Sequence, residues 1–116
     1  MTAHYDIEVD QEAYYSQLFT WKDSNLNPQN ITGFSAKMQI REDADDEDPA
    51  LVTLQDGSGI TLGGTAGTIL VTMPASETAS LPDGNLVYDL LIIDPSNHPK
   101  RLLEGRVIVA KAVTRI

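Results

Sequence analysis

The chain has 116 residues, 41% of them hydrophobic, with a formal net charge of -9 and no cysteine. Most domains hold roughly 100–150 residues, so this length predicts a single domain over residues 1–116. The lack of cysteine excludes a disulfide framework, a thiolate metal site and a cysteine nucleophile. Negative charge repels phosphates and anionic lipids, so we expect no nucleic acid and no membrane as partners.

Short strands separated by turns are predicted from the N-terminus onward. The first are expected at residues 4–9 and 14–21, and in the second the side chains of Tyr15, Phe19 and Trp21 share one face. Because aromatic residues favour strands and a turn-rich segment follows, we prefer a strand at 14–21 to a helix over 11–21.

Residues 34–41 form the clearest predicted strand. Apolar side chains occupy every second position and polar ones lie between them, which predicts one buried face and one wet face. Further strands are expected at residues 50–54, 60–62, 68–73 and 86–93. A final strand region follows at 101–116, in which Gly105 is expected to mark a bulge.

A short helical turn is expected at residues 74–81, with Ser76 able to cap its start. Eight or nine strands at this spacing predict an all-β fold, a single antiparallel β-sandwich. The side chains expected to be largely buried in it are Phe34, Met38, Tyr88 and Leu90.

The densest charge in the sequence directly follows the predicted strand 34–41. Six acidic residues stand within seven positions: Glu42, Asp43, Asp45, Asp46, Glu47 and Asp48. An EF-hand needs a central glycine and a regular series of ligands, and this segment has neither, although an irregular calcium site stays conceivable. We favour a solvated loop that discourages aggregation, with docking to a basic surface of a partner as the second interpretation.

No combination of residues predicts catalysis or a cofactor. The two histidines, His4 and His98, stand far apart in the sequence, and Ser58 lacks the spacing and the strand-to-helix context of a nucleophile elbow. The glycine-rich segment 57–64 has neither the last glycine of a dinucleotide fingerprint nor the lysine of a phosphate loop. We therefore expect a protein that is not an enzyme.

Aromatic residues gather near the N-terminus, where they could form a platform for sugars. They include Tyr14, Tyr15, Phe19 and Trp21. Aromatic side chains on an alternating strand more often belong to the core. An exposed Trp21 would favour a carbohydrate-binding sandwich, and a buried one would favour a structural protein.

Several phrases, read in order, resemble small all-β structural proteins of tailed-bacteriophage virions. They are "YDIEVDQEAYYSQLFTWKD", "ITGFSAKMQIR", "ASETASL" and "LVYDLLIID…RLLEGRVIV". The domain looks similar to the immunoglobulin-like N-terminal module of baseplate upper proteins and tail-fibre attachment proteins. These phrases extend over nearly the whole chain, and they are structural rather than catalytic.

The resemblance implies an immunoglobulin-like sandwich that acts in the virion, after synthesis in the bacterial cytoplasm. It implies binding to other virion structural proteins in multiple copies, as an adaptor or attachment module near the baseplate and tail fibres. Capsid decoration on the phage head is an alternative. Because no fibre or receptor-binding extension follows residue 116, an adaptor, cap or decoration unit is expected. The expected contact residues are the acidic run, the loop 22–30, and Tyr5, Tyr14 and Tyr15.

Overall fold

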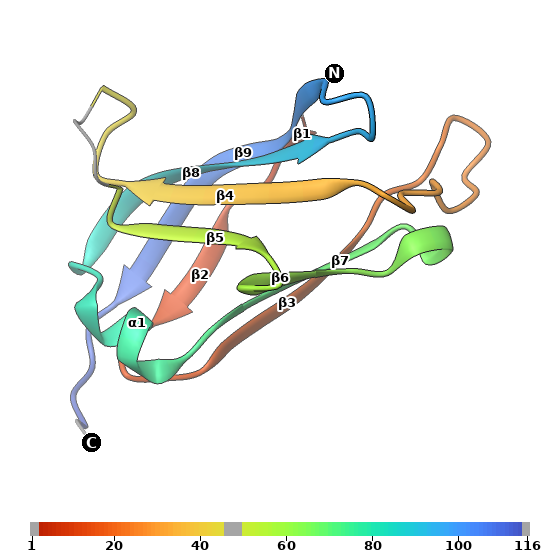
Figure 1. The fold of residues 1–116 in the computed structure, drawn as a ribbon. Coiled ribbons are helices and arrows are strands. Elements are labelled where there is room, and N and C mark those ends of the chain that lie inside the picture. Colours follow the sequence, from red (N-terminus) through yellow and green to blue (C-terminus); the bar gives the residue numbers. More distant parts are fainter. Residues whose placement is uncertain (1–2, 46–49, 115–116) are drawn as a thin grey trace.

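The computed structural model describes residues 3–45 and 50–114, and the chain between those bounds folds into strands, one short α-helix and one 3-10 turn (Figure 1). The strands are β1 (Ala3–His4), β2 (Ile7–Asp10), β3 (Tyr15–Thr20), β4 (Ser35–Arg41), β5 (Val52–Asp56), β6 (Gly59–Leu62), β7 (Thr68–Met73), β8 (Gly84–Ile93) and β9 (Pro99–Ala110). The helix α1 spans Ala75–Ser80, and the 3-10 turn η1 spans Gly64–Ala66.

One curled sheet makes both layers of the fold. Its strand order is β1-β9-β8-β4-β5-β6-β7-β3, and β2 pairs with β9 beside β1. Figure 1 shows β9, β8 and β4 in one layer and β6, β7 and β3 in the other, with β5 at the side where the sheet turns over. The two layers pack face to face and enclose the core, which is the arrangement of a β-sandwich. The predicted all-β sandwich is confirmed.

Alternation of side chains explains how these strands bury a common core. Along β4, Ala36, Met38 and Ile40 are at most 3% exposed, while the residues between them face outward. Tyr88 and Leu90 are buried as predicted, but Phe34 precedes β4 and is only partly buried. In β3 the predicted faces are also found, because Tyr15 and Phe19 point inward and Leu18 points to solvent.

The sequence predicted an entirely antiparallel sandwich, but some strand pairings are parallel. The N-terminal strands β1 and β2 run parallel to β9, and β5 pairs with β6 in parallel over two residues. The other ladders are antiparallel, including β4 with β8. A parallel pairing between the first and last strands brings together segments about 100 residues apart in the sequence, and no local pattern predicts it.

Two local predictions were wrong. The irregularity of β9 lies at Leu102, opposite the step from Leu90 to Leu91, and Gly105 pairs regularly with Tyr88. Ser76 does not cap α1, because the N-cap is Pro74 and no side chain bonds to the helix start. The helix is instead held at Thr78, which is fully buried and whose hydroxyl lies 2.8 Å from the carbonyl oxygen of Ala13.

Two tyrosine hydroxyls lie inside the sandwich. The Tyr88 hydroxyl donates a hydrogen bond to the carbonyl oxygen of Tyr5 at 2.5 Å. The Tyr15 hydroxyl is buried and has no partner within the described chain. Burial raises the pKa of Tyr15 to about 12, and burial also raises the pKa of Tyr88.

We expect the thermal midpoint to fall as the pH rises from about 10 to about 12, because the unfolded chain ionises its tyrosines near pH 10 while folded Tyr15 stays neutral to about 12. A raised folded pKa gives stability that is complete below the unfolded pKa and lost above it. Thermal unfolding followed by circular dichroism across this range tests the prediction. The double variant Tyr15→Phe and Tyr88→Phe should lose this alkaline dependence, and a flat wild-type midpoint up to pH 12 would contradict it.

Candidate functional site

The outer face of the layer β4, β8 and β9 carries long ionised side chains in cross-strand rows. The register places Arg41, Val87 and Arg106 side by side in one row. The next row holds Gln39, Asp89 and Glu104, and the third holds Lys37, Leu91 and Arg101. Two basic rows therefore flank a row that contains both carboxylates. We call these nine residues the charged face.

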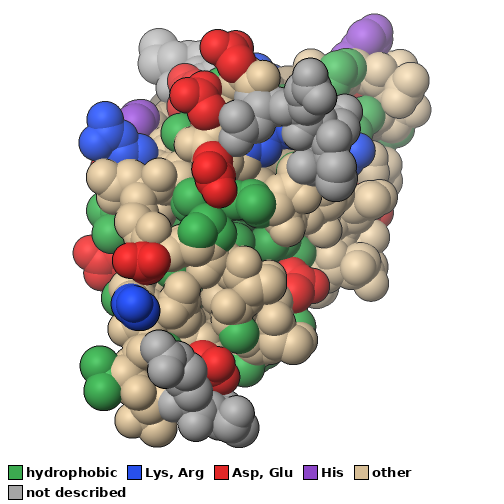
Figure 2. Space-filling model, turned by 90° about the vertical axis from the view of Figure 1, so that its left-hand side faces the viewer, with side chains coloured by type: hydrophobic (Ala, Val, Ile, Leu, Met, Phe, Trp, Pro, Cys, Tyr) green, Lys and Arg blue, Asp and Glu red, His purple; other side chains and the backbone are tan. Residues whose placement is uncertain are grey.

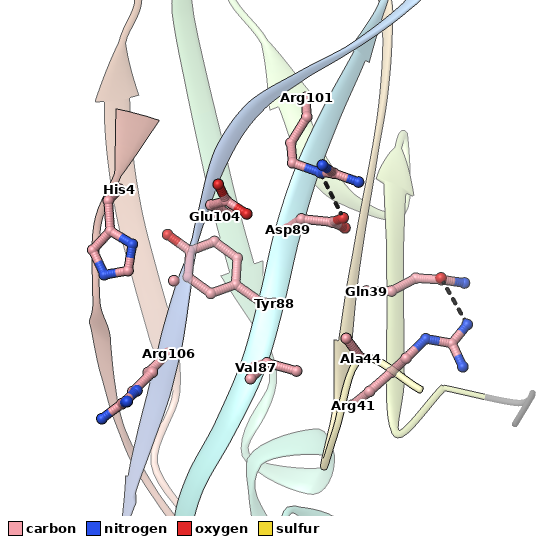
Figure 3. Close-up of a pocket in the computed structure, with 11 residues that line it drawn as sticks. His4, Gln39, Arg41, Ala44, Val87, Tyr88, Asp89, Arg101, Glu104 and Arg106 are labelled. Carbon is pink, nitrogen blue, oxygen red and sulfur yellow. Dashed lines mark hydrogen bonds and ion pairs between the residues drawn. The ribbon is translucent and has the colours of Figure 1, made fainter. Parts of the chain in front are cut away.

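A groove of about 540 Å³ lies over part of the charged face (Figure 3). His4 of β1 and Ala44 line it together with residues of all three strands of the face. Across its floor, the Nε of Arg101 lies 3.1 Å from the Asp89 carboxylate, and a terminal nitrogen of Arg41 donates to the Gln39 side chain at 3.0 Å. These bonds hold two arginines flat along the sheet, where the close-up shows them.

The charge of this face differs from that of the rest of the molecule. Four of the eight lysines and arginines of the chain lie on it, beside two carboxylates, although the whole chain carries a net charge of -9. Clustered arginines favour carboxylate groups, because the planar guanidinium donates two parallel hydrogen bonds to one carboxylate. The face therefore suits an acidic surface or an acidic peptide.

The N-terminal strand forms one border of the groove through polar contacts. The His4 imidazole lies 3.1 Å from the Asp6 carboxylate, and that carboxylate accepts a hydrogen bond from the backbone N–H of Arg106 at 2.9 Å. The Arg106 N–H is the main reason why the pKa of the Asp6 carboxyl lies below its usual range, and His4 adds to this. These bonds attach the segment between β1 and β2 to the charged face.

The acidic run begins where β4 ends, beside the charged face. Glu42, Asp43 and Asp45 are exposed, and the Asp45 N–H donates to the Asp43 carboxylate at 3.1 Å, which closes a local turn. The other three predicted residues, Asp46, Glu47 and Asp48, lie outside the described residues. Figure 2 shows this end of the molecule, with acidic side chains gathered at the top of the view.

The aromatic candidates do not form one platform. Tyr14 is 67% exposed and Tyr5 is 43% exposed, but the Tyr5 ring packs edge-on against Phe19 with 5.5 Å between centroids. Tyr15 points into the sandwich. Trp21 is partly buried against the core, and the Lys100 ammonium lies 5.5 Å from its ring centroid. Because Trp21 is partly covered and lies outside the groove, it does not favour sugar binding.

The loop 22–30 is held by its own hydrogen bonds. The Asp23 carboxylate accepts bonds from the N–H groups of Asn25 and Asn27, and Lys22 bridges to Pro28. At its tip, Leu26 has a φ of 66° and is 77% exposed. A left-handed leucine that points to solvent is uncommon, which makes the tip a second candidate contact.

Sequence reasoning missed the charged face. Lys37, Gln39 and Arg41 were visible as the wet face of a strand, but Arg101, Glu104 and Arg106 stand about 60 residues later. Only the register of β4 with β8 and of β8 with β9 places them together. Alternation identifies an outward side chain, but it does not identify the neighbouring strand.

Residues considered for catalysis stay apart in the fold. His4 lies on β1, His98 lies in the turn between β8 and β9, and Ser58 lies in the turn between β5 and β6. Among residues 3–45 and 50–114, no three His, Asp or Glu side chains lie close enough to hold a metal ion. No helix in the same ranges is long and apolar enough to cross a membrane.

No family model matches the chain, and no curated protein matches it. A structure titled "Structure-based site-directed photo-crosslinking analyses of multimeric cell-adhesive interactions of VGSC beta subunits" is similar over 96% of this chain and 93% of the other. The two sequences are 11% identical, and the TM-score is 0.42.

Proposed function

We propose that this protein is a non-enzymatic structural component of a tailed-phage virion, an adaptor or attachment module that binds other virion proteins. The observation that carries the binding role is the charged face, a basic sheet surface that adjoins an acidic turn. One molecule thus presents opposite charges on adjoining surfaces. It can contact an acidic region of one neighbour and a basic region of another.

The composition of the charged face supports contact with a protein. Arginine is enriched in protein interfaces, where its long stem covers apolar surface and its guanidinium pairs with carboxylates. Val87 and Leu91 lie partly buried between the basic residues and add apolar floor. Complementary charges then set the orientation of the partner and the rate of encounter.

The virion part of the proposal is supported by the resemblance of the phrases in the sequence to phage structural proteins. Many copies in a symmetric particle would make weak individual contacts sufficient, because each further contact forms at high effective concentration. An interface on the order of 800 Å² per partner, or several smaller ones, is expected.

Replacing the six acidic residues of 42–48 by their amides should abolish or strongly reduce incorporation into particles while the domain stays folded. The physical reason is the loss of attraction to a basic neighbour, so high salt should also release the wild-type protein. Particles are purified from cells that express each variant, and the amount of the protein per particle is measured by quantitative mass spectrometry. Arg106→Glu tests the charged face in the same way.

The control replaces an exposed acidic residue elsewhere, as Asp83→Asn, and should incorporate normally. Normal incorporation of the six-residue variant would rule out the acidic run as a docking element. If the native protein were found only free in solution and never in purified particles, the virion proposal would be wrong.

A further inference from the structure

The strand β3 has a free edge. It is the last strand in the sheet order, and within the described chain its only partner is β7. Free edges can pair with another chain, and proteins usually protect them with charge, proline or a bulge. The six residues of β3, YSQLFT, include no charge and no proline, and their ladder with β7 is regular.

The backbone groups on this edge can be assigned from the ladder. The Trp21 N–H donates to the Gly67 carbonyl oxygen at 2.8 Å, in the same register that pairs Phe19 with Ile69. In an antiparallel ladder the hydrogen-bonded pairs alternate, so Tyr15, Gln17 and Phe19 bond toward β7. The N–H and C=O groups of the alternate residues, Ser16, Leu18 and Thr20, therefore point away from β7.

The outer face of this layer carries no ionisable side chain on β3 or β7. Ser16, Leu18 and Thr20 of β3 lie opposite Thr72, Leu70 and Thr68 of β7. Leu18 is 55% exposed at the centre of this face. The outer face of β3 and β7 is therefore uncharged, whereas the charged face on the other layer carries several ionised side chains. The two surfaces suit different partners.

We propose that the free edge of β3 is an interface for a second copy of this chain. The two β3 strands run antiparallel across a two-fold axis at Leu18, and the two β3 layers join into one continuous sheet. In this register all outward backbone groups of each strand find partners: Leu18 pairs with Leu18, and Ser16 pairs with Thr20. A shift by two residues would place one of these residues opposite a position beyond the end of the strand.

The side chains are self-complementary in the same register. Because Leu18 lies opposite Leu70 within one molecule, the joined sheet carries a row of four leucines, Leu70, Leu18, and the same two from the second copy. On each side of this row, Ser16 of one copy lies next to Thr20 of the other. This arrangement covers the exposed Leu18 and brings no like charges together.

The opposite border of the sandwich is protected against such pairing. The strand β2 and the residue before it carry Asp6, Glu8 and Asp10 within five positions, and Glu8 and Asp10 are exposed. Antiparallel pairing of two β2 edges would bring carboxylates close together, which is unfavourable. The two edges thus differ in charge, and only β3 offers an unprotected one.

The contact between two strands is smaller than the roughly 800 Å² per partner of stable complexes. The dimer is therefore weak in dilute solution and gains from high local concentration. This inference does not depend on the proposed virion function, because it concerns how two copies of the isolated protein associate.

Sedimentation velocity over micromolar to millimolar concentrations tests the dimer. The wild-type protein is expected to shift from monomer to dimer, and Leu18→Lys is expected to remain a monomer, because it places two ammonium groups across the two-fold axis. Leu26→Lys is the matched control, since it changes another exposed leucine to lysine outside β3, in the loop 22–30, and should still dimerise. Thermal unfolding verifies that each variant is folded.

Cross-linking tests the register in this cysteine-free chain. In the proposed pair the two Leu18 Cα atoms are about 5.5 Å apart, whereas the two Leu70 positions are separated by two further strand spacings of about 4.8 Å each. A short thiol-to-thiol reagent should therefore link Leu18→Cys into dimers much faster than Leu70→Cys. The proposal would be overturned by any of three results. These are a wild-type protein that stays monomeric at millimolar concentration, a dimer that responds equally to both lysine variants, and equal cross-linking of both cysteine variants.

Discussion

Met38→Asp is expected to destabilise the fold by several kcal/mol, which is a large part of the roughly 5–15 kcal/mol that stabilises a domain. Met38 is 2% exposed on β4, which pairs with β5 on one side and β8 on the other. Its cross-strand neighbours, Leu54 and Leu90, are equally buried and offer no partner for a carboxylate. At neutral pH we expect a thermal midpoint lower by more than about 10 °C, or no folded protein.

Lys37→Asp is the matched control, because it introduces the same side chain one residue earlier on the exposed face of β4. It should cost little, since surface changes usually lie within about 0.5 kcal/mol. Burial raises the pKa of a carboxyl, so the deficit of Met38→Asp should shrink below pH 4, where the acid is neutral in both states. Equal midpoints for the wild type and Met38→Asp would mean that the inner face of β4 is assigned incorrectly.

The fold class was predictable because the sequence repeats one local rule. Along residues 34–41 apolar side chains recur at every second position, and along 14–21 Tyr15 and Phe19 were predicted to share one face. Both segments contain strands, β4 and β3, in which these side chains alternate as predicted. Such a pattern depends only on the geometry of one strand. Of the acidic residues after β4, Glu42, Asp43 and Asp45 are exposed, as expected for a solvated connection.

The pairing of distant segments was not predictable in this way. The parallel ladder of β2 with β9 joins the first residues to the last ones, and the rows of the charged face depend on the registers among β4, β8 and β9. Side-chain alternation is the same for an edge and for a central strand. Free edges such as that of β3 therefore become visible only when the neighbours are known.

The role of Gly105 shows the same limit at a single residue. A glycine within a predicted strand suggested a bulge, but Gly105 is a regular part of β9. In the fold the Tyr5 carbonyl crosses directly above it, so close that a Cβ on residue 105 would overlap the Tyr5 carbonyl oxygen, and that Cβ would lie 3.0 Å from a carboxylate oxygen of Asp6. The glycine is required by the approach of a distant segment, which no local pattern contains.

Gly105→Ala is expected to displace the segment that joins β1 to β2. The φ of Gly105 is not in the left-handed region, so alanine adds no backbone strain and the effect comes from the overlap alone. The displaced carbonyl of Tyr5 would lose the Tyr88 hydroxyl, and the Asp6 carboxylate would lose the Arg106 N–H. Hydrogen bonds contribute about 1 kcal/mol each, and more when one partner is charged, so we expect a loss of roughly 2–4 kcal/mol.

Amide hydrogen exchange shows which part of the fold is destabilised in Gly105→Ala. The N–H of Tyr5, which donates to the Glu104 carbonyl at 2.9 Å, and the N–H of Arg106 should exchange much faster in Gly105→Ala. The amides of β4 and β8 should keep their relative protection, because the overlap does not involve their mutual ladder. Glu104→Ala changes the neighbouring exposed position and should leave all of these amides protected. If Gly105→Ala exchanged like the wild type, the close approach of Tyr5 to β9 would be wrong, and with it the attachment of the N-terminal strand to the charged face.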